Sequence, residues 1–273
     1  IGEELTSNKE YGYKLVDNYY DLFSLNTENN SEVIFAATSI DGAMENNWFA
    51  HVLPGDFPTQ SGVTKWNGFK MAWPFYQSYE SNDKRLERIY AEYTGDDGKV
   101  HSYENDRVNG SMGENLYFGA VPLKYDLSGV KGENNQIDLV IYRYADVITL
   151  YAEALVRKDN LVSQTALNFL NEVRVKHGGL PAYKMAEVSD VNVFLDKMLE
   201  ERGHEFYFEG VRRQDLIRHG KFIEKAIEKN QFAGQSIEKV STMVDGKYKY
   251  ELYPLPLALI TEGKGIIKQN PGY

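Results

Sequence analysis

The feature that most constrains this fold is a helical stripe that changes from apolar to charged without changing its spacing. The apolar positions are Val191, Leu195 and Met198, and the charged positions that follow are Arg202, Glu205 and Glu209. Residues at three- and four-residue intervals lie on one face of a helix. A face that begins in the core stays near it, so these charged side chains are expected to be buried or half buried. Buried charges require partners.

We therefore predict a buried ion-pair network between this helix and the segment after Gly210. Its expected members are Glu201, Arg202, Glu205, Glu209, Arg212, Asp215 and Arg218. Such a network need not add net stability, but deleting one member leaves its partner buried and unpaired. The pair Glu201 and Glu205 is also the candidate acid pair of a glycoside hydrolase. Nearby guanidinium groups lower a carboxyl pKa, whereas a general acid needs a raised one, and this disfavours the hydrolase.

Composition excludes several other classes of function. The chain has 273 residues, 42% of them hydrophobic, which is enough for a substantial core. The 30 Lys and Arg against 40 Asp and Glu give a net charge of -10. An acidic balance argues against a nucleic-acid partner. The absence of cysteine excludes disulfides and thiolate metal sites.

No motif for covalent catalysis or cofactor binding is found. The sequence has no G-x-S-x-G and no glycine-rich phosphate loop, so neither a catalytic residue nor a cofactor is predicted. His204 and Glu205 begin a zinc-protease motif, but Phe208 stands where the second histidine is required. The remaining candidate calcium ligands, without EF-hand spacing, are Asp96, Asp97, Asn105 and Asp106. We predict no metal site.

Hydrophobic periodicity predicts helices mainly in the C-terminal half. They are residues 144–155, a helix capped by Ser163 and ended by Gly178, a helix capped by Ser189 and ended by Gly210, and residues 213–229 with a kink at Gly220. The N-terminal half is predicted to hold an amphipathic helix over residues 13–23, a short strand over residues 32–37 and a hairpin turn over residues 94–100.

Residues 38–81 are rich in glycine, proline, asparagine and aromatic residues and have no sustained period. All 3 tryptophans of the chain lie there. Aromatic rings stack on the apolar faces of sugar rings, while polar side chains bind the hydroxyls. The predicted ligand-binding residues are Trp73, Trp66, Trp48, Tyr76, Asn67 and Gln77. Trp73 is favoured because Pro74 fixes the chain after it; the alternative is that these rings form the core of irregular loops.

Three ordered motifs resemble the SusD/RagB family of surface lipoproteins that bind nutrients for TonB-dependent transporters in the Bacteroidetes. The first is "EERGHEFYFEGVRRQDLIR", which holds the charged stripe. The second is "YRYADVITLYAEAL" with "ALNFLNEVRVKHG", and the third is the closing "YPLP" and "QNPGY". Together they span the C-terminal half of the chain. The family's usual Asn-Pro before the last motif is replaced by Gly263, Lys264 and Gly265.

The resemblance implies a mainly α, SusD-like fold with tetratricopeptide-type helical pairs, long irregular loops and minor β elements. It implies a non-catalytic cell-surface subunit that binds an oligosaccharide and passes it to a SusC-type transporter of the outer membrane. A peptide ligand is the first alternative. A structural lid whose only partner is the transporter is another.

The resemblance also sets the expected domain organisation. The start of the chain is similar to the middle of a family member, so we expect a C-terminal portion of a SusD-like domain. Residues 1–137 would be its loop-rich ligand side, and residues 138–273 its helical pairs and closing segment. Membrane attachment would come only through an N-terminal lipid absent from this chain.

Overall fold

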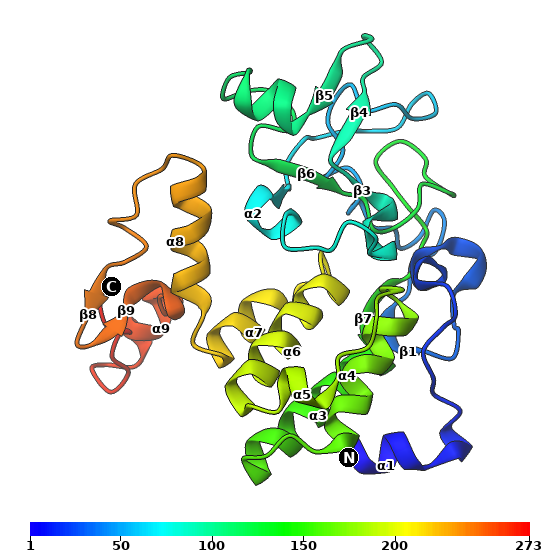
Figure 1. Cartoon of the computed structure of the whole chain (residues 1–273). Helices are drawn as coiled ribbons and strands as arrows, with labels where there is room; N and C mark the ends of the chain where they lie inside the picture. Colours follow the sequence, from blue (N-terminus) through cyan, green and yellow to red (C-terminus); the bar gives the residue numbers. More distant parts are fainter. The chain divides into compact units, whose positions relative to one another are not determined.

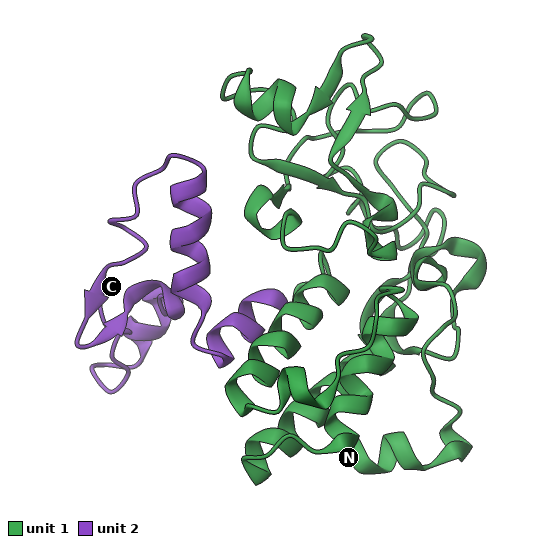
Figure 2. Ribbon diagram, in the orientation of Figure 1, with its two compact units in different colours: residues 1–210 green, residues 211–273 purple.

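The computed structural model describes residues 1–273, which form two compact units (Figures 1 and 2). The first unit is residues 1–210 and the second is residues 211–273. This boundary does not coincide with the compositional division after residue 137. None of the helices combines the length and the hydropathy that crossing a bilayer requires.

Four helices of the first unit pack around one hydrophobic cluster. They are α3 (Tyr144–Asp159), α4 (Gln164–Lys176), α5 (Met185–Val188) and α6 (Val191–Glu205). Phe194 and Met198 of α6 are fully buried against Leu170 of α4 in this cluster. The Ser163 side chain caps α4 by accepting a hydrogen bond from Ala166 N, as predicted. Asp190, and not Ser189, caps α6.

Helix α6 ends at Glu205 and does not continue to Gly210 as predicted. The chain leaves the helix at Phe206, and the freed carbonyl oxygens find another donor. Lys124 Nζ donates to the carbonyl oxygens of Glu205 and Tyr207, at 2.9 Å each. The buried ammonium therefore satisfies carbonyl groups that a further helical turn would otherwise engage.

The strands are short and form small antiparallel sheets. In the first unit β1 (Val33–Ala37) pairs with β7 (Leu139–Arg143), β6 (Gly119–Pro122) lies between β2 (Met71–Ala72) and β3 (Ile89–Tyr90), and β4 (Glu92–Thr94) pairs with β5 (Val100–Ser102). The β4–β5 hairpin confirms the predicted turn, and β1 confirms the predicted strand. Val33 lies opposite Arg143 in the β1–β7 register, which brings the start of β1 to the start of α3.

Residues 13–23 do not form the predicted helix. Only Tyr19–Phe23 turns, as the 3₁₀-helix η2. Leu15 and Val16 are buried without belonging to a helix, and Val16 N donates to Glu32 Oε2 at 2.9 Å. The apolar spacing indicated a helix because the segment is buried on several sides. Instead of a helical carbonyl oxygen, the Glu32 side chain accepts the hydrogen bond from the backbone of Val16. The other short elements of this unit are α1 (Gly2–Ser7), η1 (Lys9–Tyr11), η3 (Leu25–Thr27), α2 (Trp73–Tyr76), η4 (Lys84–Arg88) and the π-helical turn η5 (Tyr103–Val108).

The second unit holds α7 (Arg212–Arg218), α8 (Phe222–Phe232), the pair β8 (Met243–Val244) and β9 (Lys247–Tyr248), η6 (Lys249–Glu251) and α9 (Leu257–Glu262). The predicted kink at Gly220 is a complete break, because this glycine has φ +68°. Gln269 of the closing motif accepts from Leu255 N at 2.7 Å and donates to Leu255 O at 2.9 Å. The "QNPGY" segment is thus tied back to the "YPLP" segment.

Candidate functional site

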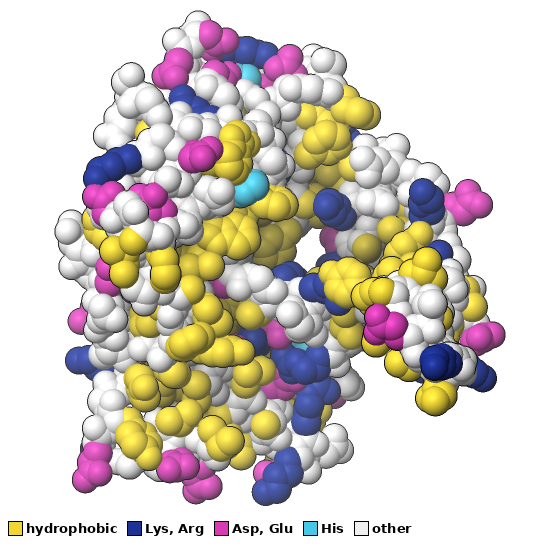
Figure 3. Space-filling model, turned by 180° about the vertical axis from the view of Figure 1, so that it is seen from behind, with side chains coloured by type: hydrophobic (Ala, Val, Ile, Leu, Met, Phe, Trp, Pro, Cys, Tyr) yellow, Lys and Arg dark blue, Asp and Glu magenta, His cyan; other side chains and the backbone are white.

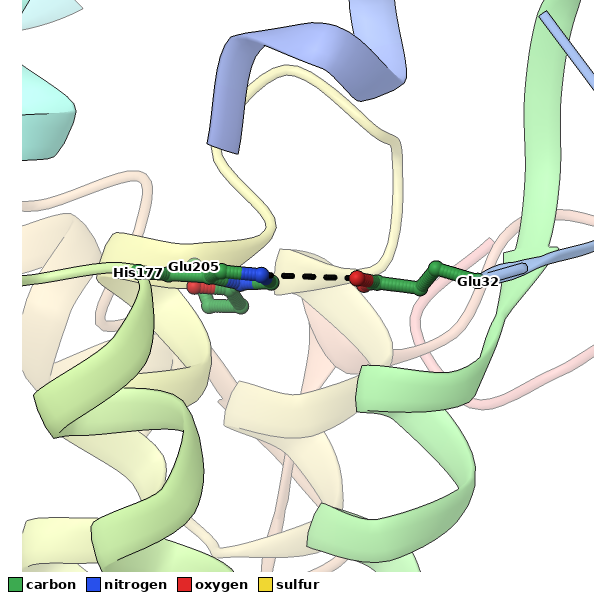
Figure 4. Close-up of side chains that lie close together, drawn as sticks. All are labelled: Glu32, His177 and Glu205. Carbon is green, nitrogen blue, oxygen red and sulfur yellow. Dashed lines mark hydrogen bonds and ion pairs between the residues drawn. The ribbon is translucent and has the colours of Figure 1, made fainter. Parts of the chain in front are cut away.

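The charged stripe of α6 lies inside the first unit, with Glu205 at its centre. His177 Nδ1 lies 2.7 Å from Glu205 Oε1, and Figure 4 shows this pair beside Glu32. Arg143 Nη1 donates to the same oxygen at 2.5 Å, and Arg85 Nη1 donates to Oε2 at 3.1 Å. All of these side chains are nearly fully buried. The Glu205 carboxylate is therefore enclosed by three cationic groups.

Each cation also reaches a further carboxylate. Arg85 donates to Glu201 at 2.6 Å and to Asp83, which caps η4. Arg143 Nη1 donates to Glu32 at 2.9 Å, and its other nitrogens donate to Glu209. The result is one buried network that joins α6 to β1, η4, β7 and the end of α4.

The predicted burial of Arg202 and Glu205 is confirmed, at 2% and 0% exposure. The predicted supply of partners was incomplete, because Arg85, Arg143, Lys124 and His177 come from distant segments. The predicted members Arg212, Asp215 and Arg218 lie in the second unit, where Arg218 donates to Asp215 at 2.7 Å. Their membership of the same network stays a prediction.

The electrostatics of the two candidate acids differ. Burial raises the pKa of Glu205, but His177, Arg143 and Arg85 outweigh it and hold that pKa well below its usual value. Burial raises the pKa of Glu201 in spite of Arg85, opposite to the direction expected from the sequence. Both carboxylates are nonetheless sealed from solvent and occupied by guanidinium groups. They are placed to hold the fold together and have no open face for a substrate.

The exposed candidate site is the aromatic cluster, which consists of Trp48, His51, Trp66, Phe69 and Phe208. The His51 ring lies 4.7 Å from Trp66, 5.5 Å from Phe69 and 6.4 Å from Trp48 between ring centroids. Phe208 closes the group, at 5.3 Å from Trp48 and 6.2 Å from Phe69. Trp48 is 36% exposed and Trp66 43%. The rings therefore contact one another and still present surface to solvent.

Backbone bonds in the loops place these rings. Trp66 N donates to Ala50 O at 2.8 Å, and Phe69 N donates to His51 O at 2.6 Å. Gly68 approaches so closely that an added Cβ would lie 2.9 Å from His51 O. The close approach explains the glycine of the "WNGF" segment.

Phe208 has φ +60°, a left-handed conformation that a bulky side chain rarely adopts. Such strain is held only where the surrounding structure enforces it, and it concentrates at functional sites. Here Phe206 and Tyr207 are buried on one side of the chain, while Phe208 is half-buried in the aromatic cluster. The strained backbone thus aims Phe208 at the rings of the loop region.

A polar edge adjoins the aromatic cluster. Asn67 follows Trp66 at φ +52°, and its amide donates to Asn115 Oδ1 at 3.0 Å. Lys70 Nζ donates to Asn67 Oδ1 at 2.6 Å, and burial lowers the pKa of Lys70 to about 8. Hydrogen-bonding groups therefore lie directly beside the exposed rings, which is the combination that a sugar requires.

The structure corrects the preference for Trp73. This side chain is 1% exposed, and its Nε1 donates to Leu116 O at 2.8 Å. Tyr76 packs against Trp73 at 5.7 Å, and Gln77 is exposed just after α2; neither has a ring contact or hydrogen bond to the aromatic cluster. Of the predicted ligand-binding residues, Trp48, Trp66 and Asn67 lie in or beside the aromatic cluster. The sequence did not predict His51 and Phe208 as members of this cluster.

A separate hollow of about 640 Å³ lies in the second unit. Its lining includes Glu224, Lys225 and Glu228 of α8 with aliphatic neighbours, and it holds none of the predicted ligand-binding residues. Hydrophobic side chains also gather on the face of the first unit drawn in Figure 3. The aromatic cluster remains the site that combines exposed rings with hydrogen-bonding groups.

The profile of the SusD family matches residues 17–273. The chain belongs to the SusD family. This is a family of non-catalytic binding proteins, in agreement with the sealed carboxylates of Glu201 and Glu205. A SusD-like protein of Bacteroides ovatus is 27% identical over 268 residues, which cover 92% of this chain and 46% of that protein. A SusD-like protein P38 of Formosa agariphila is 29% identical over 136 residues, which cover 46% of this chain and 25% of that protein.

Solved structures confirm the SusD-like, mainly helical fold. A SusD homolog from Bacteroides thetaiotaomicron superposes with a TM-score of 0.75 at 19% identity, covering 100% of this chain and 58% of that one. Surface glycan-binding protein A from the same species, in complex with laminarihexaose, superposes with a TM-score of 0.69 at 22% identity, covering 98% and 58%. The SusD-family chain described here thus spans about half the length of these Bacteroides relatives.

Proposed function

We propose that the protein is the glycan-binding subunit of a cell-surface nutrient uptake complex, and that the aromatic cluster contacts the sugar. The observation that carries the proposal is the pair of exposed tryptophans, Trp48 and Trp66, whose rings both pack edge-to-face with His51. Sugar rings offer apolar faces for such rings to stack on, and Asn67 supplies hydrogen bonds at the edge. The relative solved with laminarihexaose supports an oligosaccharide as the ligand class.

The proposed partner is a SusC-type TonB-dependent transporter, and the proposed location is the outer surface of the outer membrane. Family membership supports both statements. Family membership also supports attachment to that membrane through a lipid.

Isothermal titration tests the ligand. Laminarihexaose is the first probe, followed by a panel of other neutral oligosaccharides and a peptide library. Trp66→Ala is expected to remove stacking of about 1–3 kcal/mol, by analogy with bases on aromatic side chains. That corresponds to about 5- to 150-fold weaker binding. The matched control is Tyr142→Ala, which removes an exposed ring of β7 that stacks on Phe35 outside the aromatic cluster.

The expected result is binding of at least one oligosaccharide, weakened in Trp66→Ala and unchanged in Tyr142→Ala. Binding of peptides alone would show that the ligand is a peptide and not an oligosaccharide. Equal losses of affinity in both variants would show that the aromatic cluster is not the specific contact for the ligand.

A further inference from the structure

His101, Asp106 and Glu114 lie together outside the aromatic cluster, and we infer that they form a binding site for a divalent transition-metal ion. One possible ligand atom of each lies within 4.8 Å of the others. His101 is on β5 and Asp106 on η5, while Glu114 is in the loop that leads to β6. The inference does not depend on the proposed glycan function.

Asp106 provides the observation that points to an ion. Its side chain is 0% exposed. Oδ2 lies 2.8 Å from His101 Nδ1 and accepts from Leu116 N at 2.8 Å. The other oxygen, Oδ1, is buried and has no hydrogen-bond partner. A buried carboxylate oxygen without a donor is costly and rare in folded proteins, and a bound cation would satisfy it.

The histidine is already oriented as a metal ligand. On the side of the ring away from Asp106, Nε2 lies 2.8 Å from Asp56 Oδ2. The other oxygen of Asp56 accepts from Tyr93 and Asn115, at 2.8 and 2.6 Å, which fixes the carboxylate. In metal sites the second ring nitrogen usually donates to such a carboxylate, which sets the tautomer and turns the first nitrogen to the ion. An ion at Nδ1 would replace the proton shared with Asp106 and release it to solvent.

The side chain of Lys99 already occupies part of the proposed metal site. The Lys99 ammonium forms an ion pair with the Glu114 carboxylate. The Lys99 side chain is 44% exposed, so it is free to swing into solvent when an ion arrives. The cluster therefore attracts positive charge, and the lysine competes for Glu114.

The donor set decides the class of ion. One imidazole nitrogen with two carboxylate oxygens suits zinc and neighbouring divalent transition metals, whereas calcium takes six to eight oxygen ligands. Zinc binds these atoms at about 2.0–2.2 Å, so two ligands of a tetrahedral ion lie about 3.4 Å apart. The candidate ligand atoms lie within 4.8 Å of one another, so binding requires their side chains to rotate toward the ion. Three protein ligands leave a further position for water.

The test titrates the EDTA-treated and dialysed protein with zinc chloride, and with calcium chloride for comparison. We expect one zinc ion per chain and weaker binding of calcium. Asp106→Asn and His101→Gln should each lose zinc binding by more than tenfold. Asp56→Asn should weaken it by about 10- to 100-fold, the usual effect of removing the partner of a ligating histidine. Melting curves without metal verify that each variant is folded.

Two further variants keep the result decisive. Glu104→Gln removes an exposed charge from the same π-helical turn, outside the cluster, and should leave zinc affinity unchanged. Lys99→Met removes the competing ammonium from the surface and should tighten zinc binding. Absence of stoichiometric zinc binding by the unaltered protein would overturn the inference. So would equal losses in Glu104→Gln and Asp106→Asn, or weaker binding in Lys99→Met.

Discussion

His177 Nδ1 lies 2.7 Å from Glu205 Oε1 in the interior of the first unit, and its Nε2 lies 3.4 Å from Glu32. Burial lowers the pKa of His177, but the two carboxylates outweigh burial and raise it to about 9. The histidine is thus a buried cation at neutral pH. A metal ion on these three residues would have to displace Arg143, which contacts both carboxylates.

The protonated His177 makes stability depend on pH. Because its folded pKa of about 9 exceeds the unfolded value of 6.5, its contribution is complete below pH 6.5 and is lost as pH rises through 9. The shift corresponds to about 3 kcal/mol. Chemical denaturation of the protein and of His177→Gln at several pH values measures this. The difference in unfolding free energy should be largest near pH 6 and shrink by about 3 kcal/mol toward pH 9.5. Lys124, whose pKa burial lowers to about 8, is present in both proteins and cancels. A difference that is flat with pH would show that His177 is neutral when folded.

Arg202→Ala is expected to lower the free energy of unfolding by about 3 kcal/mol, because it removes one side of a buried pair. Arg202 donates to Thr149 Oγ1 at 2.6 Å and lies 2.8 Å from Asp146. The control on the same helix is Lys197→Ala, whose pair with Glu200 is exposed and should contribute less than about 1 kcal/mol. Similar melting of Arg202→Ala and the unaltered protein would refute the structural role of Arg202.

The tryptophans should separate stability from binding. Trp73→Ala removes a fully buried ring and its hydrogen bond to Leu116, and should cost about 3–5 kcal/mol of stability. Trp66→Ala removes a ring that is 43% exposed, so it should melt near the unaltered protein while losing glycan affinity. Thermal melts measure the stability of both variants, and titrations measure their glycan affinity. A Trp66 variant that unfolds as readily as the Trp73 variant would assign both rings to the core.

Gly68→Ala probes the placement of the rings without deleting one. The added Cβ would lie 2.9 Å from His51 O, so the backbone that carries His51 or Phe69 must shift. Overpacking of this kind costs about 1–3 kcal/mol. We expect glycan affinity to fall, and the control for loop substitution is Gly55→Ala, at a loop position with open space around it and no left-handed backbone. Unchanged affinity in Gly68→Ala would mean that the ring positions do not matter to the ligand.

The sequence predicted those features that depend on local spacing. The stripe of α6 showed that Arg202 and Glu205 are buried, because helical geometry places them in line with Met198. The Ser163 cap was visible for the same reason. The partners of the stripe were not visible, because Arg85 is 116 positions from Glu201 and 120 from Glu205. No local rule selects such a partner over the nearer arginines.

The site was predictable only as a region. A loop rich in aromatic residues contains both core and surface rings, and burial depends on distant acceptors. Trp73 is held in the interior by its hydrogen bond to Leu116 O, 43 positions away in the chain. The neighbouring Pro74 did not indicate this distant acceptor. Phe208 joins the aromatic cluster from beyond α6 through a strained backbone, and only its place beside Gly210 hinted at an unusual turn. His51 gave one signal that was not used, its position between Trp48 and Trp66 in the same loop region.

The most direct test of the central claim, that the aromatic cluster binds glycan, is a fluorescence titration that uses the 3 tryptophans of the chain. Trp48 and Trp66 are exposed in the aromatic cluster, whereas Trp73 is buried apart from it. Adding an oligosaccharide that binds by calorimetry should change tryptophan emission in the unaltered protein and in Trp73→Phe. The change should vanish in the double variant Trp48→Phe and Trp66→Phe. An emission change that persists in the double variant and disappears in Trp73→Phe would contradict the account.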